Sequence, residues 1–87
     1  MPVFEKSNAK NKKYKTVYNG KTINFGDSRM QQYKDSTGLG LYSSKDHGDS
    51  IRRKSYLARA KGIKNKEGQL TWKLKSSPNY YSVRYLW

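Results

Sequence analysis

The sequence predicts a small α+β domain with an N-terminal β-hairpin, a long irregular loop, a basic central helix and a short aromatic C-terminal helix. Three observations predict this class. An Asn-Gly pair separates two runs of β-branched and aromatic residues, and a run of arginines and lysines follows a capping aspartate. The last stretch of the chain opens with Ser-Pro and is rich in Tyr and Trp. With 87 residues, the chain forms one domain at most.

The composition is strongly basic and aromatic. Lys and Arg number 19 against 6 Asp and Glu, so the formal net charge is +13. A charge of this size repels itself and attracts polyanions, which makes nucleic acid the leading candidate partner, ahead of acidic protein surfaces and anionic lipid. Only 33% of the residues are hydrophobic and 14% are aromatic, so the core must rely on aromatic rings.

The residues that are missing exclude several kinds of chemistry. The chain has no cysteine, which excludes disulfides, thiolate nucleophiles and cysteine-based zinc sites. No apolar run approaches the roughly 20 residues that span a bilayer, and we expect no contact with a membrane. The first residues lack the apolar core of a signal peptide. We therefore expect the protein to act inside a cell, or in a particle assembled there.

The N-terminal residues are polar and rich in lysine. We predict that residues 1–13 form a basic flexible arm and that residues 14–87 form a single small domain. The lysines of the arm either contact phosphate or remain solvated, and composition does not distinguish these alternatives.

The predicted hairpin turns at Asn19-Gly20. Both residues tolerate the positive φ angles of a type I′ turn, and the flanking residues are β-branched or aromatic. Alternation along the second strand places Ile23 and Phe25 on one face. Because an isolated hairpin is marginally stable, this one must pack on a helix or on a partner.

A long segment follows the hairpin, and the 27–50 loop is rich in Gly, Ser and Asp without a sustained period. A loop of this length in a small domain is uncommon and tends to be functional. Its TGLGLY piece lacks the spacing and the following Lys-Ser or Lys-Thr of a phosphate-binding P-loop. We interpret that piece as a turn anchored by Leu39, Leu41 and Tyr42.

The central helix is predicted over residues 50–61. Asp49 or Ser50 is its N-cap, and Gly62 fits the left-handed position after its end. A short apolar stripe is formed by Ile51, Tyr56, Leu57 and Ala60. The other faces carry cations, and arginine holds phosphate in a bidentate fork. The candidate residues for binding nucleic acid or an acidic partner are Lys12, Lys13, Lys15, Arg52, Arg53, Lys54, Arg59 and Lys61.

Four tyrosines allow two interpretations. They can stack on bases, or they can pack in the core, and we favour the core for each. These tyrosines are Tyr33, Tyr42, Tyr56 and Tyr80.

Residues 70–75 alternate between apolar and polar side chains. Leu70, Trp72 and Leu74 fit one face of a short, half-buried strand, although an extended loop is an alternative. Beyond them, Ser77 is the expected N-cap of the C-terminal helix.

Proline at the first helical position supports this C-terminal helix. Its spacing places Tyr80, Val83, Arg84 and Trp87 on one face. A chain that closes on Tyr-Leu-Trp suggests docking, on this domain or on a neighbour. The residues assigned to protein interaction or to the core are Tyr80, Tyr81, Tyr85, Leu86 and Trp87.

Asp46, His47 and Asp49 form the densest group of acid, base and metal-ligating side chains. A metal site normally needs three or four ligands with a supporting shell, and this chain has one histidine and no cysteine. Asp49 is favoured near a helix N-terminus by the helix dipole, and both aspartates can pair with the arginines that follow. We therefore predict helix capping and ion pairing, with no catalytic residue, no metal, no cofactor and no enzymatic activity.

Three segments resemble a group of small basic proteins of uncharacterised function that double-stranded DNA viruses encode. The segments are NGKTINFGDSRMQQYKD, DHGDSIRRKSYLARA and SPNYYSVRYLW. The viruses include tailed phages, crAss-like phages among them, and giant DNA viruses. The matching positions are Phe25, Gly26, His47, Asp49, Arg52, Arg53, Tyr56, Ala58, Arg59, Tyr81, Ser82, Arg84 and Trp87. The resemblance covers roughly residues 14–87. The chain departs from it over RAKGIKNKEGQLTWKLK, where the family has Arg-His after the alanine and a different spacer, so a role tied to that second histidine does not carry over.

The resemblance implies a virus with a large DNA genome and a place in or on its particle, but no activity. Together with the charge, it leads us to expect a small basic virion structural protein: a minor capsid, cement or connector component. Its partners are then other virion proteins and double-stranded DNA, contacted through backbone phosphates. Alternatives are a nucleoid-like DNA-binding protein without sequence specificity and a small inhibitor of a host factor.

Overall fold

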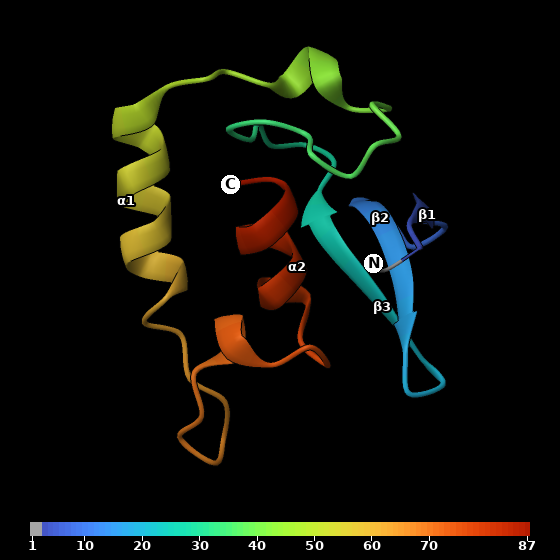
Figure 1. Ribbon diagram of the computed structural model, residues 1–87, viewed down its shortest axis with the longest axis vertical. Helices are drawn as coiled ribbons and strands as arrows, with labels where there is room; N and C mark the ends of the chain where they lie inside the picture. Colours follow the sequence, from blue (N-terminus) through green and yellow to red (C-terminus); the bar gives the residue numbers. More distant parts are fainter. Residues whose placement is uncertain (1–2) are drawn as a thin grey trace.

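The computed structural model describes residues 3–87, and it confirms a small α+β fold (Figure 1). The elements are β1 (Glu5–Lys6), β2 (Lys12–Tyr18), β3 (Lys21–Asp27), the 3-10 turn η1 (Ser43–Lys45), α1 (Ser50–Ala60), the 3-10 turn η2 (Thr71–Lys73) and α2 (Pro78–Tyr85). The strands form an antiparallel sheet in the order β1-β2-β3. Helix α2 lies between this sheet and α1, so the molecule has three layers.

The predicted flexible arm is wrong for residues 3–13, and residues 1–2 lie outside the described residues. Strand β1 pairs with β2, and Phe4 is buried with 7% of its surface exposed. Its ring meets Phe25 at 5.5 Å and Tyr85 at 4.7 Å between centroids. The burial of Phe4 and the backbone pairing of β1 with β2 therefore hold a stretch whose composition predicts disorder.

The hairpin between β2 and β3 is confirmed. Asn19 and Gly20 have φ angles of 50° and 75°, as a type I′ turn requires, and Tyr18 pairs with Lys21 across it. Ile23 and Phe25 are both buried, so the predicted alternation along β3 also holds. The face that they share packs on α2.

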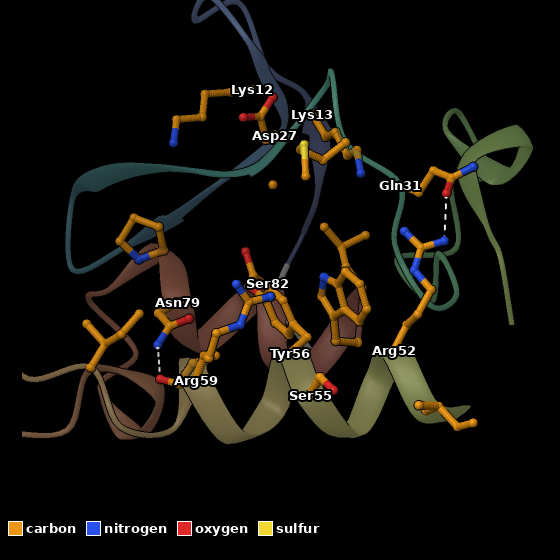
Figure 2. Close-up of a pocket in the computed structure, with 18 residues that line it drawn as sticks. Lys12, Lys13, Asp27, Gln31, Arg52, Ser55, Tyr56, Arg59, Asn79 and Ser82 are labelled. Carbon is orange, nitrogen blue, oxygen red and sulfur yellow. Dashed lines mark hydrogen bonds between the residues drawn. The ribbon is translucent and has the colours of Figure 1, made fainter. Parts of the chain in front are cut away.

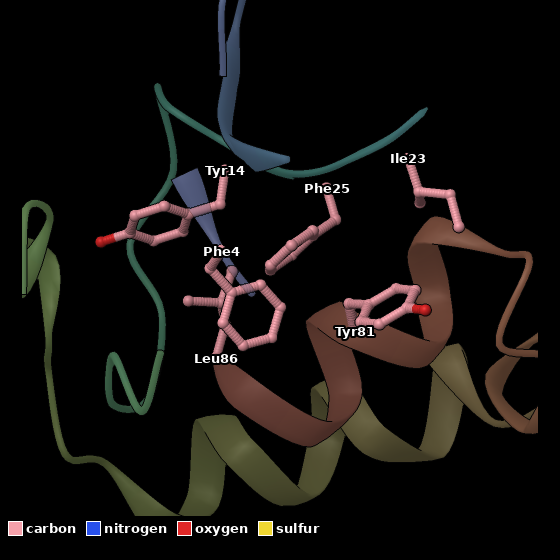
Figure 3. Packing of buried hydrophobic residues seen from close by; sticks show 6 residues of the cluster. All are labelled: Phe4, Tyr14, Ile23, Phe25, Tyr81 and Leu86. Carbon is pink, nitrogen blue, oxygen red and sulfur yellow. The ribbon is translucent and has the colours of Figure 1, made fainter. Parts of the chain in front are cut away.

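The core is a cluster of rings supplied by the sheet and by the C-terminal residues, as Figure 3 shows. Its buried members are Phe4, Tyr14, Ile23, Phe25, Tyr81 and Leu86. The buried residues of α2 are Tyr81 and Ser82. Tyr80 and Trp87, which the sequence places on one face with Val83 and Arg84, pack against the border of the cluster. The Tyr81 hydroxyl donates to the Lys75 backbone oxygen at 2.6 Å, so its polar end is satisfied.

The 27–50 loop is irregular, as expected, but polar groups hold it. Gln32 is fully buried; its amide donates to the Tyr42 oxygen at 2.8 Å and to Asp46 Oδ1 at 2.6 Å. Leu39 and Leu41 are 43% and 54% exposed, so the predicted apolar anchors are wrong except for Tyr42, which packs on the core. A buried amide with several partners fixes a loop that has few apolar residues.

Tyr14 and Asp35 form the second polar anchor of this loop. The Tyr14 hydroxyl donates to Asp35 and accepts from the Leu41 backbone N–H at 3.1 Å. The other oxygen of Asp35 accepts from the hydroxyl and the backbone N–H of Thr37. Burial and the Asp35 carboxylate raise the pKa of Tyr14 to about 12.

Both helix N-termini are capped as predicted. Asp49 accepts from the backbone N–H groups of Ile51 and Arg52, and Ser77 accepts from that of Asn79. The left-handed conformation predicted at Gly62 is wrong. Its N–H donates to the Arg59 oxygen, so the chain continues in tight right-handed turns after α1.

Residues 70–75 do not form the predicted strand. The 3-10 turn η2 occupies their centre, so they are not an extended loop along their whole length either. Leu70 makes only an isolated antiparallel bridge to Lys64. Thr71 donates to the Ile63 oxygen, and Asn79 donates to both Thr71 Oγ1 and the Ala60 oxygen. These contacts tie η2 and the end of α1 to α2, which apolar alternation alone does not predict.

Candidate functional site

A cleft of about 670 Å³ lies between the open end of the hairpin, α1 and α2. Figure 2 shows the residues that line it. Strand β2 contributes Lys12 on one side, and α1 contributes Arg52 and Arg59 on the other. The fold thus brings together cations that are about forty residues apart in the chain. All three side chains belong to exposed residues.

Arg52 reaches across one end of the cleft. Its Nη1 donates to Gln31 Oε1 at 2.8 Å, drawn as a dashed line in Figure 2. A guanidinium has five N–H donors, so this bond leaves most of them free for an anion. The contact to Gln31 also fixes the position of the guanidinium, which lowers the entropy lost on binding.

Asp27 is the one acid among the described residues that line the cleft. Arg29 forms a two-pronged pair with it, with Nη2 to Oδ2 at 2.9 Å and Nε to Oδ1 at 3.1 Å. These bonds lower the pKa of Asp27 to about 2. The carboxylate is therefore ionised but already paired, and the cleft retains an excess of positive charge.

Lys13 forms part of the cleft wall but is itself buried, with 1% of its surface exposed. Its ammonium donates to the amide oxygen of Gln32. Burial, together with repulsion from Lys45, lowers the pKa of Lys13 to about 8. Lys13 therefore adds positive potential behind the wall and anchors the loop, while exposed cations remain to touch a ligand.

The floor of the cleft is apolar and aromatic. Tyr56 and Trp87 stack with centroids 4.0 Å apart and an angle of 10° between their planes. Burial raises the pKa of Tyr56, so its hydroxyl stays neutral. Met30, Ile51 and Ile63 line the edges and are 60%, 77% and 51% exposed. Exposed apolar groups beside a basic rim are typical of a binding surface.

Two of the other predicted binding residues contact aromatic rings. Arg53 donates to the Trp87 backbone oxygen at 2.7 Å and lies over the Tyr33 ring, 5.2 Å from its centroid. Lys61 lies 5.0 Å from the centroid of the Trp72 ring. These two cations help to pack the chain on itself, and neither lines the cleft.

The remaining two predicted cations also lie away from the cleft. Lys15 faces Glu5 at 3.8 Å, and Lys54 is exposed. The structure thus gathers four of the eight predicted residues at one cleft and disperses the other four.

The aromatic residues of the C-terminal segment belong to the core and its border. Tyr81 and Leu86 are buried, whereas Tyr80, Tyr85 and Trp87 pack against the buried cluster. Of the two roles predicted for these residues, the structure shows packing within the domain.

The acidic cluster that precedes α1 serves to position backbone and side chains. Asp46 accepts from Gln32 and from the Asp35 backbone N–H, and His47 Nδ1 accepts from the Asp49 backbone N–H at 2.9 Å. The predicted pairing with the following arginines is absent from the ion pairs of residues 3–87. Those residues also contain no group of three or more His, Asp or Glu side chains that could hold a metal.

Sequence reasoning missed Gln31, Met30 and Ile63 as cleft residues. The available signal was weak: two large apolar side chains in polar surroundings. Trp87 was recognised as a docking residue but not as part of the cleft floor, because its stacking on Tyr56 depends on how α1 and α2 meet.

Comparison with known proteins supplies one match. The profile described as "Family of unknown function (DUF5754)" matches residues 3–37, which comprise the three strands and the start of the loop and are less than half of the chain. No curated protein and no solved structure matches the chain. Across residues 3–87, no helix is long and apolar enough to cross a membrane.

Proposed function

We propose that this protein is a small basic virion component that binds DNA through backbone phosphates, with the cleft as its binding surface. The observation that carries the proposal is the convergence of Lys12, Arg52 and Arg59 on one cleft whose acid, Asp27, is already paired with Arg29. It is a binding protein rather than an enzyme.

The chemistry of the rim suits phosphate. Arginine presents a planar fork of donors that matches two phosphate oxygens, and lysine adds a point charge. These contacts carry no base sequence information, so we expect binding without sequence preference and with a steep dependence on salt. The net charge of +13 supplies long-range attraction to the same partner.

The virion setting rests on the resemblance of three sequence segments to small viral proteins, and contacts to other virion proteins are part of that proposal. Exposed apolar side chains outside the cleft offer surfaces for them: Val17 on the hairpin and Leu39 and Leu41 on the loop. The nucleoid-like DNA-binding protein is the second candidate. It is favoured by the packing of Tyr81 and Leu86 within the domain, which removes them from any contact with a neighbour.

The first experiment measures DNA affinity against salt for the wild type and for a variant with Lys12→Gln, Arg52→Gln and Arg59→Gln. The slope of log affinity against log salt should flatten by about 2 to 3 units, since each phosphate contact contributes about 0.7 on single strands and about 0.9 on duplex. The matched control neutralises Lys54, Lys66 and Lys75, which are exposed and outside the cleft. Equal slopes in the two variants would refute the cleft as the phosphate site.

A second experiment separates the virion component from the nucleoid-like protein. Quantitative mass spectrometry of purified particles, before and after their DNA is removed, measures the copy number of the chain. A fixed number retained in empty shells supports the virion structural protein. Loss together with the DNA supports the nucleoid-like protein, and absence from both preparations contradicts the virion proposal.

A further inference from the structure

We propose that the cleft binds single-stranded nucleic acid, with phosphates on the basic rim and bases on the aromatic floor. This inference rests on the proposed function and specifies the form of its ligand. It follows from the combination of two surfaces in one cleft: the exposed cations Lys12, Arg52 and Arg59, and the apolar floor built around the stacked rings of Tyr56 and Trp87.

The basic rim alone would be enough to bind duplex DNA, so duplex binding does not explain the apolar floor. In a duplex the flat faces of the bases are stacked on one another inside the helix, and the protein meets phosphates and groove edges. Met30, Ile51 and Ile63, which are 51% to 77% exposed, would then remain largely uncovered. A single strand offers phosphates and unstacked base faces together, and proteins that bind it combine cations with aromatic and apolar platforms.

The dimensions of the cleft agree with such a ligand. Its volume of about 670 Å³ lies within the usual range of about 300 to 1,000 Å³ for sites that enclose small ligands. Lys12 of β2 lies on one side of the cleft and Arg52 and Arg59 of α1 lie on the other, so a bound strand would meet cations from both elements (Figure 2). Arg52 and Arg59 are seven residues apart on α1, about 10.5 Å along the helix, so they can contact two different phosphates of one strand.

An acidic peptide is a weaker fit to the same surface. Its carboxylates would satisfy the rim, but most of its side chains offer no flat apolar face to the rings of Tyr56 and Trp87. Stacking of a base on an aromatic ring contributes about 1 to 3 kcal/mol per base, and every base can supply it. The aromatic floor therefore favours nucleic acid over an acidic polypeptide.

The test compares three fluorescent probes at one salt concentration: an oligothymidylate of about 20 nucleotides, an abasic phosphodiester of the same length, and a duplex of that length. The oligothymidylate should bind at least about tenfold more tightly than the abasic strand, because only it can stack bases. It should also quench Trp87 fluorescence in a Trp72→Phe background, which removes the other tryptophan. The abasic strand should not quench.

A variant with Met30→Ser and Ile63→Ser tests the apolar edges beside the aromatic floor without touching the core, since both side chains are exposed. The preference for oligothymidylate over the abasic strand should fall to about threefold or less, because the apolar contact with the bases is lost. The matched control is Val17→Ser, a residue that is 64% exposed and lies outside the cleft; its preference should stay at the wild-type value.

The outcomes separate the inference from the proposed function. If the oligothymidylate, the abasic strand and the duplex bind equally, while neutralising the rim still flattens the salt slope, the single-strand inference is wrong and phosphate binding stands. If no probe binds in a way that depends on the rim cations, both fail. If polyglutamate quenches Trp87 and displaces the oligothymidylate at equal charge concentration, the ligand is an acidic protein and the inference is overturned.

Discussion

Helix α1 differs from the unit formed by the sheet and α2 in how much of its surface is buried. Residues from Phe4 to β3 and the C-terminal segment supply the entire buried hydrophobic cluster of the described residues. Within α1, only Ala60 is buried. Helix α1 is attached through the stack of Tyr56 on Trp87, through Arg53 and through the bond from Asn79 to the Ala60 oxygen.

This difference explains how so basic a chain can fold. The core forms from residues that carry little charge, so the cations of α1 need not be desolvated. Arg52 and Arg59 can therefore stay exposed at the cleft. The sheet and α2 therefore provide most of the stability, and α1, which is attached at few points, carries the exposed positive charge.

The largest expected effect comes from the core. Phe25→Ala removes a fully buried ring from the sheet and should lower the free energy of unfolding by about 3 to 5 kcal/mol, which is most of the stability of a domain this small. Leu57→Ala removes a partly buried side chain from α1 and should cost about 1 to 2 kcal/mol. Urea unfolding followed by circular dichroism measures the free energy of unfolding of both variants. Equal losses would contradict the difference between α1 and the sheet unit.

The second effect concerns Lys13, the buried cation of the sheet unit. Between pH 8 and pH 10 the folded protein releases the Lys13 proton, because its pKa is lowered to about 8, while the unfolded chain keeps it. The unfolded state then binds more protons, so stability should rise with pH, by about 2 kcal/mol over this window. Tyr14, whose pKa is raised to about 12, reverses the trend above pH 10, where unfolded tyrosine ionises first.

The control for this pH effect is Lys13→Met. This variant removes the buried ammonium, and with it the titration that the neighbouring charges shift. Those charged neighbours are Lys45, Asp27, Asp35 and Asp46. Chemical denaturation at several pH values should show a smaller rise for the variant than for the wild type, whatever its absolute stability. Parallel curves for the two proteins would contradict the assignment of the rise to Lys13.

The smallest effect should be confined to α1. Asp49→Ala removes the side chain that accepts from two backbone N–H groups and should cost about 1 kcal/mol. Hydrogen exchange should become faster in the first turn of α1 and stay unchanged in β2 and β3, because α1 is attached at few points. Asp49→Asn keeps the acceptor and should restore protection; acceleration across the sheet would show that the two units are not separate.

Local chemistry explains which elements could be predicted. The turn at Asn19-Gly20 and the caps Asp49 and Ser77 follow from interactions within a few residues, and all three appear as expected. The incorrect predictions at residues 3–13 and 70–75 involve partners that are distant in the chain, whereas the one at Gly62 is local. The burial of Phe4 and the hydrogen bonds of Asn79 determine the conformation of those segments. Neither contact can be recognised from the neighbouring residues in the sequence.

The sequence predicts the basic character of the binding surface but not the residues that line the cleft. Its cations were recognised from charge, but the sequence could not separate Lys12, Arg52 and Arg59 from Arg53, which binds the Trp87 oxygen and covers a tyrosine ring. The exposed edge at Met30 was not anticipated, because the loop that carries it has no period from which to infer a direction.

The sequence by itself determined the excess of positive charge, the aromatic core composition, the hairpin turn and the N-caps of the two helices, because these depend on composition or on neighbours in the chain. The tertiary structure decided which cations meet at one cleft, which face of α2 is buried and how the 27–50 loop is held. These features depend on contacts between distant residues, such as Lys13 with Gln32 and Tyr56 with Trp87. Packing selects among such pairs only when the whole chain is folded.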